Sequence, residues 1–206
     1  MPAALAPSRL LACGILASSV FLVVTAMQVP PGYDTLRHPV SALVLGPEGW
    51  VQTLNLVVTG LLVAAFTLGL WRSPDRGAAL PALMSLAATG IFGVALFATD
   101  PVSGYPAGTA AGTSTGLLHN TFAGLFFVTL AAAALVAANR AGRTGFARYS
   151  VLSVIAVIAG CGLAGLGFMQ VPVLVDWAGL LQRVAILAAF AWLAVFSARS
   201  YRAAHP

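Results

Sequence analysis

The chain has 206 residues, of which 60% are hydrophobic and only 7% are charged, with a formal net charge of +5. Soluble domains carry roughly 25% charged residues, so this composition excludes a water-exposed surface over most of the molecule. The solvent of the folded chain must be lipid. All ten basic residues are arginine, and we draw no indication of nucleic-acid binding from that bias.

Six apolar runs are long enough to cross roughly 30 Å of hydrocarbon as helices. A backbone in lipid must satisfy its hydrogen bonds within the segment, which predicts an all-α fold. The first run has an apolar core longer than the roughly 7–15 residues of a signal peptide, so we count it as a span. The sequence predicts one integral membrane domain over residues 1–206, a six-transmembrane-helix bundle with spans at approximately 9–29, 50–71, 78–99, 116–138, 149–171 and 177–198.

The arginines predict the orientation of these spans. With the N-terminus inside, eight of the ten arginines fall in the inner segments, beside a single inner acid, Asp75. The outer half holds Arg37 and Arg183 together with the other four acids. The sequence therefore predicts that both termini are cytoplasmic.

Two outer connections, 30–49 and 100–115, hold most of the polar chemistry. In the first of them, the segment PVSALVL predicts a helix of about two turns that begins with Pro39 and stops at Gly46. Its apolar positions would lie in the outer interface or dip into the bundle, while Trp50 anchors the next span at headgroup level. We expect this connection to act as a lid.

Polar residues also lie within the outer ends of the spans. Gln52, Asn55 and Thr59 share one face of the second span, and His119 lies more than one turn inside the fourth. These positions predict a polar pocket that opens to the outer face.

Arg183 lies within the last apolar run, where facing lipid would cost several kcal/mol. Three alternatives follow: a structural salt bridge, binding of an anionic substrate group, or snorkelling towards the surface. The candidate partners for a salt bridge are Asp176, Asp100 and Glu48.

Small residues bear on packing and on assembly. Cys13 and Cys161 lie inside apolar runs at different depths, so no disulfide is predicted. Ala156, Gly160 and Ala164 have a spacing that lets another helix approach closely. That helix could belong to this chain or to a second copy, which leaves a homo-oligomer open.

Three motifs carry a resemblance to a known family. The segment GYDTLRHPVSALVLGPEGWVQTLN, with FATDP ending the third span and GLLHN opening the fourth, resembles domain of unknown function 998, an uncharacterised family of bacterial membrane proteins. The resemblance covers essentially the whole chain and implies a six-span protein of the bacterial inner membrane, without an established activity. The matching positions here are Tyr33, Asp34, His38, Ser41, Gly49, Trp50, Asn55, Asp100 and His119.

The first functional hypothesis is a membrane-embedded hydrolase or transferase acting on a lipid or amphiphile. His38, Asp100 and His119 could hold zinc and leave one position open for water. Without a metal, Ser41 would be the nucleophile, His38 or His119 the base, and Asp100 the orienting group. The substrate-binding candidates are Asn55, Gln52 and Arg183.

Two further hypotheses involve no chemistry. The same polar residues could line the pocket of a binding protein or transporter for a small amphiphile, although the inner halves of the spans are nearly free of polar groups. Alternatively, a hydrogen-bonded network could lock the outer loops of a structural, assembly or lipid-sensing protein. In all three cases the partner is the lipid bilayer.

Overall fold

The computed structural model describes residues 7–73, 77–107 and 112–204. Asp75, His205 and part of the second outer connection, 108–111, lie outside the described residues. No β-strand is formed within the described ranges, where an isolated bridge joins Val102 and Tyr105. The helices are α1 (Pro7–Leu10), α2 (Cys13–Ala26), α3 (Gly49–Trp71), α4 (Ala79–Leu96), α5 (Ser114–Ala141), α6 (Gly145–Phe168) and α7 (Ala178–Ala203), with 3-10 helices η1 (Val40–Leu45) and η3 (Val175–Trp177).

Five helices, α3 to α7, are long and apolar enough to cross a membrane, with η3 counted as the start of the last. These five confirm the prediction of a helical, multi-pass membrane protein. α2 is equally apolar but has 14 residues. At 1.5 Å per residue it is about 21 Å long, which is shorter than the hydrocarbon layer.

The first predicted span is interrupted, because α1 and α2 are separated at Leu11 and Ala12. Ser197 of α7 lies against this break. Its hydroxyl donates a hydrogen bond to the carbonyl of Leu11, and its oxygen accepts one from the N–H of Ile15 at 3.2 Å. A side chain from α7 therefore satisfies backbone groups that a continuous helix would pair internally, as an apolar setting demands.

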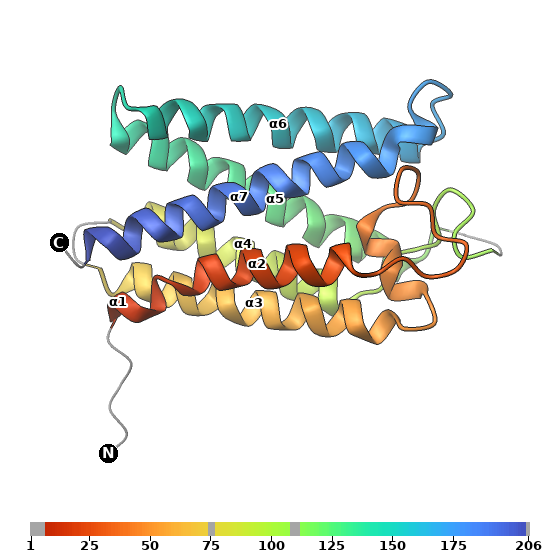
Figure 1. Cartoon of the computed structure of the whole chain (residues 1–206), viewed down its shortest axis with the longest axis horizontal. Coiled ribbons are helices and arrows are strands. Elements are labelled where there is room, and N and C mark those ends of the chain that lie inside the picture. Colours follow the sequence, from red (N-terminus) through yellow and green to blue (C-terminus); the bar gives the residue numbers. More distant parts are fainter. Residues whose placement is uncertain (1–6, 74–76, 108–111, 205–206) are drawn as a thin grey trace, which may run out of the picture.

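The long helices form a closed ring, in which each packs against the next in the chain and α7 returns against α2 (Figure 1). The two ends of the chain lie at one end of the bundle. The connections that follow α2 and α4 lie at the opposite end, which is called the outer end below.

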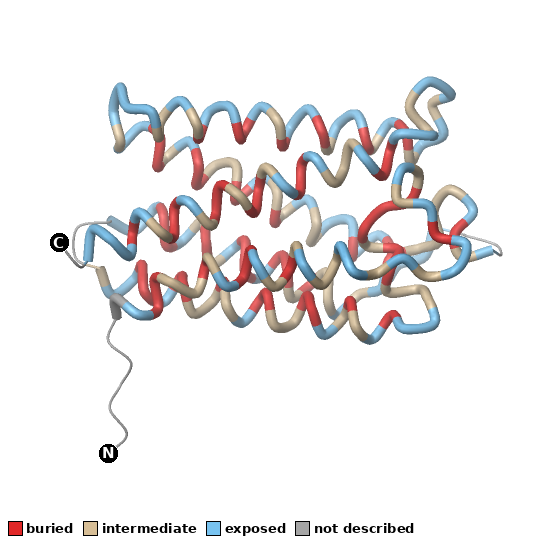
Figure 2. Tube along the Cα trace, viewed as in Figure 1, coloured by how far each residue is buried: buried red, intermediate tan, exposed pale blue. Residues whose placement is uncertain are grey.

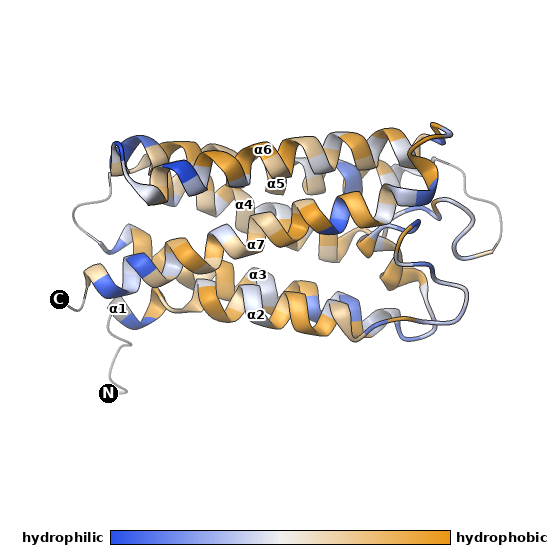
Figure 3. Ribbon diagram, turned by 45° about the horizontal axis from the view of Figure 1, so that its top comes forward, coloured by the Kyte–Doolittle hydropathy of each residue, from blue (hydrophilic) through white to orange (hydrophobic). Residues whose placement is uncertain are grey.

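Burial follows this ring. Buried residues lie mainly on the faces that the helices turn towards one another, while α6 exposes most of one side (Figure 2). The exposed faces are apolar over the length of the helices, and hydrophilic residues gather near their ends (Figure 3). Leu61, Val128 and Ile158 are each more than half exposed, as expected for side chains that face lipid.

Gly160 shows which helix uses the row of small residues on α6. A Cβ at this position would lie 2.8 Å from the carbonyl oxygen of Leu181 and 2.9 Å from the Cβ of Ala185. The helix that approaches closely is therefore α7 of the same chain.

Candidate functional site

A cavity of about 110 Å³ lies in the outer half of the bundle, where α2, α3, α4, α5 and α7 meet beneath η1. Most of its wall is apolar, with Phe21, Leu56 and Phe190 among the lining residues. Its polar lining residues are Ser41, Gln52, His119, Asn120 and Gln182. The cavity therefore corresponds to the predicted polar pocket.

The segment PVSALVL forms η1 and roofs this cavity. Pro39 is extended and precedes the helix, instead of occupying its first position as expected. The N–H of Val40 donates to Oε1 of Gln182 at 2.8 Å, which ties η1 to α7. Because Val40, Ala42 and Leu43 are buried, the predicted short helix is confirmed and dips into the bundle. Its movement as a lid stays a prediction.

Gln52 is completely buried and makes one-sided use of its amide. Its Oε1 accepts hydrogen bonds from Nε2 of Gln28 at 2.7 Å and from Nδ2 of Asn55 at 3.2 Å. Gln28 also donates to the carbonyl of Val24, so its nitrogen, and hence the facing oxygen of Gln52, are fixed by the network. The Nε2 of Gln52 has no hydrogen-bond partner in the described residues.

Asn55 and Thr59 continue the polar face of α3 but do not line the cavity. Nδ2 of Asn55 lies 3.3 Å from the carbonyl oxygen of Phe21 and 3.2 Å from the hydroxyl of Thr25, both on α2. The predicted substrate ligand Asn55 therefore packs behind Gln52 and orients it.

His119 is 2% exposed and reaches the cavity from α5. Its Nδ1 lies 2.7 Å from the carbonyl oxygen of Phe97, a group that can only accept, so Nδ1 carries a proton. That carbonyl is available because α4 ends at Leu96 and Phe97 is extended. In a neutral ring, Nε2 of His119 is then a hydrogen-bond acceptor.

Arg183 is bound to the backbone of the first outer connection. One terminal nitrogen donates to the carbonyl oxygens of Thr35 at 2.7 Å and His38 at 3.0 Å. The other donates to the hydroxyl of Tyr33 at 2.5 Å. The predicted carboxylate partners are therefore wrong: carbonyl dipoles and a phenol surround this cation. Within the described residues, the ion pair at this end joins Arg37 Nε to Asp176 Oδ1 at 3.5 Å.

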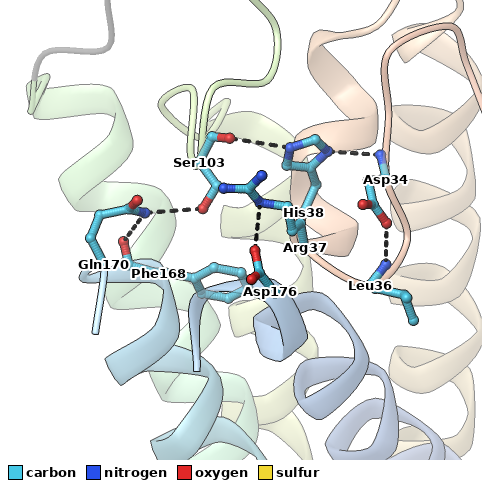
Figure 4. A network of polar contacts seen from close by, with 8 residues as sticks. All are labelled: Asp34, Leu36, Arg37, His38, Ser103, Phe168, Gln170 and Asp176. Carbon is cyan, nitrogen blue, oxygen red and sulfur yellow. Dashed lines mark hydrogen bonds and ion pairs between the residues drawn. The ribbon is translucent and has the colours of Figure 1, made fainter. Parts of the chain in front are cut away.

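His38 joins the two outer connections and is 6% exposed (Figure 4). Its Nδ1 accepts the N–H of Asp34 at 2.8 Å, so the proton lies on Nε2, which is 3.3 Å from the carbonyl oxygen of Ser103. The ring also stacks on Tyr105, with centroids 5.3 Å apart. Both ring nitrogens are engaged by backbone groups, and burial is the main cause that lowers the pKa of His38 below its usual value.

Asp100 holds the start of α5. Its carboxylate accepts the N–H of Thr113 at 2.9 Å and the hydroxyl of Thr113 at 2.6 Å. A Cβ on Gly116 would lie 2.2 Å from this carboxylate, so the first turn of α5 can approach it only with glycine there. Negative charge at a helix N-terminus is favourable, which gives Asp100 a structural role.

The predicted cluster is thus divided. Of the candidates, Ser41, Gln52 and His119 line the cavity, whereas His38, Asp100 and Arg183 do not. Over the described part of the chain, no three His, Cys, Asp or Glu side chains are grouped so that they could hold a metal ion. The arrangement therefore gives no support to a zinc site of His38, Asp100 and His119.

Sequence reasoning did not assign roles to Gln182, Asn120 or Tyr105. Gln182 carried a signal, since it is an uncharged polar residue inside an apolar run next to Arg183. Tyr105 lies in a loop, and its contacts with Tyr33 and His38 depend on the docking of two connections far apart in the sequence.

The model of one family, described as "Protein of unknown function (DUF998)", matches residues 11–199. No curated protein and no solved structure matches the chain.

Replacing Arg183 by Met should lower the free energy of unfolding by about 2–4 kcal/mol, because it leaves the loop carbonyls and Tyr33 without their donors. Thermal unfolding in detergent measures this effect. Arg37→Met is the matched control, since it removes an equal charge from an exposed ion pair worth less than about 1 kcal/mol. Equal destabilisation by the two variants would contradict the role assigned to Arg183.

Acidification should loosen the outer connections through His38. The unfolded imidazole has a pKa near 6.5 and the folded one a lower pKa. The unfolded state therefore binds the proton first, so stability is constant above about pH 6.5 and falls as the pH drops below it. Hydrogen exchange of residues 33–39 between pH 7.5 and 5 measures this. His38→Gln, which cannot titrate, should remove the pH dependence at these amides, and its persistence in that variant would refute the assignment.

Proposed function

Since the chain belongs to the DUF998 family, whose description assigns no activity, we propose a function from the cavity beneath η1: the protein binds a neutral membrane amphiphile. A hydroxyl or carbonyl group of this amphiphile would enter the cavity. The observation that carries the proposal is the buried Nε2 of Gln52, an amide donor without a partner at the wall of the cavity. Such a donor costs about 1–3 kcal/mol when unpaired, so an acceptor supplied by a ligand would bind there favourably.

The absence of charge in the wall supports an uncharged ligand group. None of the lining residues is Arg, Asp or Glu. The charged side chains nearby are committed elsewhere, Arg183 to loop carbonyls and Asp100 to Thr113. A charged headgroup in this cavity would lose its hydration without gaining a counter-charge, which is strongly unfavourable.

The size of the cavity supports partial entry. Pockets that enclose a whole drug-sized ligand measure roughly 300–1,000 Å³. At about 110 Å³ this cavity accommodates several water-sized groups. The polar end of the amphiphile would occupy it, and the hydrocarbon chain would remain among the apolar faces of the helices or in the bilayer.

A hydrolase or transferase is the second candidate, because Ser41 and His119 line the same cavity. In this version Ser41 is the nucleophile, His119 Nε2 accepts its proton, and the donors on Gln52 stabilise the oxyanion. The version has no third carboxylate, since Asp100 is bound to Thr113 at 2.6 Å and 2.9 Å.

We also propose the topology in which this cavity faces outward. α1 and α2 together would form a sixth crossing, with both termini in the cytoplasm of a bacterium and the arginine-rich end of the bundle inside. The chain ends share one end of the bundle, which is consistent with an even number of crossings (Figure 1).

Labelling tests the topology. Val173→Cys lies in an exposed outer connection and should react with a membrane-impermeant maleimide on intact cells. Ala204→Cys lies at the exposed end of α7 and should react only after permeabilisation. The reverse pattern would place the cavity on the cytoplasmic side and refute the orientation.

Ligand-dependent stability tests the function. Diacylglycerol added to the detergent-purified protein should raise its stability, by about 2.7 kcal/mol at a concentration about 100 times Kd. Gln52→Leu should abolish this gain. Thr59→Val is the matched control, since Thr59 is buried on the same helix face but does not line the cavity, and it should keep the gain.

The same samples separate the two candidates. Release of fatty acid by the wild type that is lost in both Ser41→Ala and His119→Gln, but kept in Thr59→Val, would establish the hydrolase. Stabilisation without turnover would favour binding. If no neutral lipid stabilises the wild type, or if Gln52→Leu responds like the wild type, the binding proposal fails.

A further inference from the structure

A second hollow lies at the inner end of the bundle, where the chain termini are. It has a volume of about 590 Å³ and is bordered by α4, α5, α6, α7 and the residue that follows the end of α3 by two positions, Ser73. Three arginines line it, Arg140 on α5 and Arg199 and Arg202 on α7. No acid is among its lining residues.

The charge at this hollow is not balanced by described acids. Asp34, Glu48, Asp100 and Asp176 are the acids in the described ranges, and all four lie in the outer connections or beside them. Arg140 has a partner within the protein, so the argument rests on the other two arginines. Arg199 and Arg202 are exposed at the last turns of α7 and lie three residues apart, which places them on the same side of the helix.

Arg199 is also held in place. Its guanidinium carbon lies 4.5 Å from the centre of the Phe146 ring, a cation–π contact with α6. A guanidinium that stacks on a ring keeps its N–H donors in its own plane, at the edge. These donors are oriented before any ligand arrives, which lowers the entropy cost of binding.

We propose that this hollow binds a phosphate group through Arg199 and Arg202. Planar guanidinium groups match the oxygens of a phosphate monoester or diester with paired, charge-assisted hydrogen bonds. The volume lies within the range of ligand pockets, and Leu80, Ala137 and Phe196 add an apolar wall. These features suit the headgroup of an anionic phospholipid, and free phosphate has the same chemistry.

Arginines at the inner end could instead act only as a diffuse positive charge that sets topology. A diffuse role requires neither a hollow nor an arginine fixed on a ring. The two roles differ in their dependence on position, which gives the test.

The experiment measures binding of phosphatidylglycerol to the full-length protein in neutral detergent by native mass spectrometry, with phosphatidylcholine as the uncharged-lipid reference. Arg199→Gln with Arg202→Gln should weaken phosphatidylglycerol binding roughly a hundredfold, from two charge-assisted contacts. Arg9→Gln with Arg72→Gln removes the same charge from other exposed residues near this end, outside the hollow, and should change binding less than about twofold.

Arg202→Gln alone keeps the contact of Arg199 with Phe146 and so tests the proposal even if the double variant does not fold. It should weaken binding roughly tenfold. Competition by inorganic phosphate identifies the source: displacement of the lipid at equal concentration indicates a site for free phosphate, and its absence a lipid headgroup site.

Equal losses in the two double variants, or no loss in Arg202→Gln, would overturn the proposal. So would equal binding of phosphatidylglycerol and phosphatidylcholine. None of these substitutions touches the cavity beneath η1, so the result is independent of the function proposed for that cavity.

Discussion

The outer end of this protein depends on one exchange between a cation and a loop. Arg183 lies in an apolar helix and needs acceptors, while the carbonyls of Thr35 and His38 lie outside any regular helix and need donors. Each satisfies the other at a depth where water is scarce. The same contact holds the loop over α7, and Gln182, next to Arg183, then bonds Val40 and brings η1 into the bundle. The roof of the cavity follows from this exchange.

Residue types that suggest catalysis serve here in two ways. His38 and Asp100 use their polar atoms on the backbone, one joining two connections and the other holding the start of α5. Gln52 and His119 use one atom each to fix their orientation, through Gln28 and Phe97, and line the cavity from α3 and α5. A catalytic group must keep an atom available for the substrate, and only this second pair meets that condition.

The two ends of the ring therefore differ in their chemistry. At the outer end, the cation in the bundle is enclosed by protein acceptors and the cavity presents uncharged polar atoms. At the inner end, Arg199 and Arg202 present their charge towards an open hollow. The same side chain is structural in one place and accessible in the other, because the outer connection is long enough to fold back over α7.

The sequence by itself determined the helical membrane class, the five long spans and the gathering of polar residues at one end. These depend on composition and on the length of apolar runs, which are local properties of the chain. The tertiary structure alone decided the break between α1 and α2, the acceptors of Arg183 and the separation of His38 and Asp100 from His119. Each of these depends on which backbone groups a distant segment leaves unpaired, as Ser197 does for Leu11. Backbone donors and acceptors are the same at every residue, so the letters of a sequence do not mark those that a fold will present.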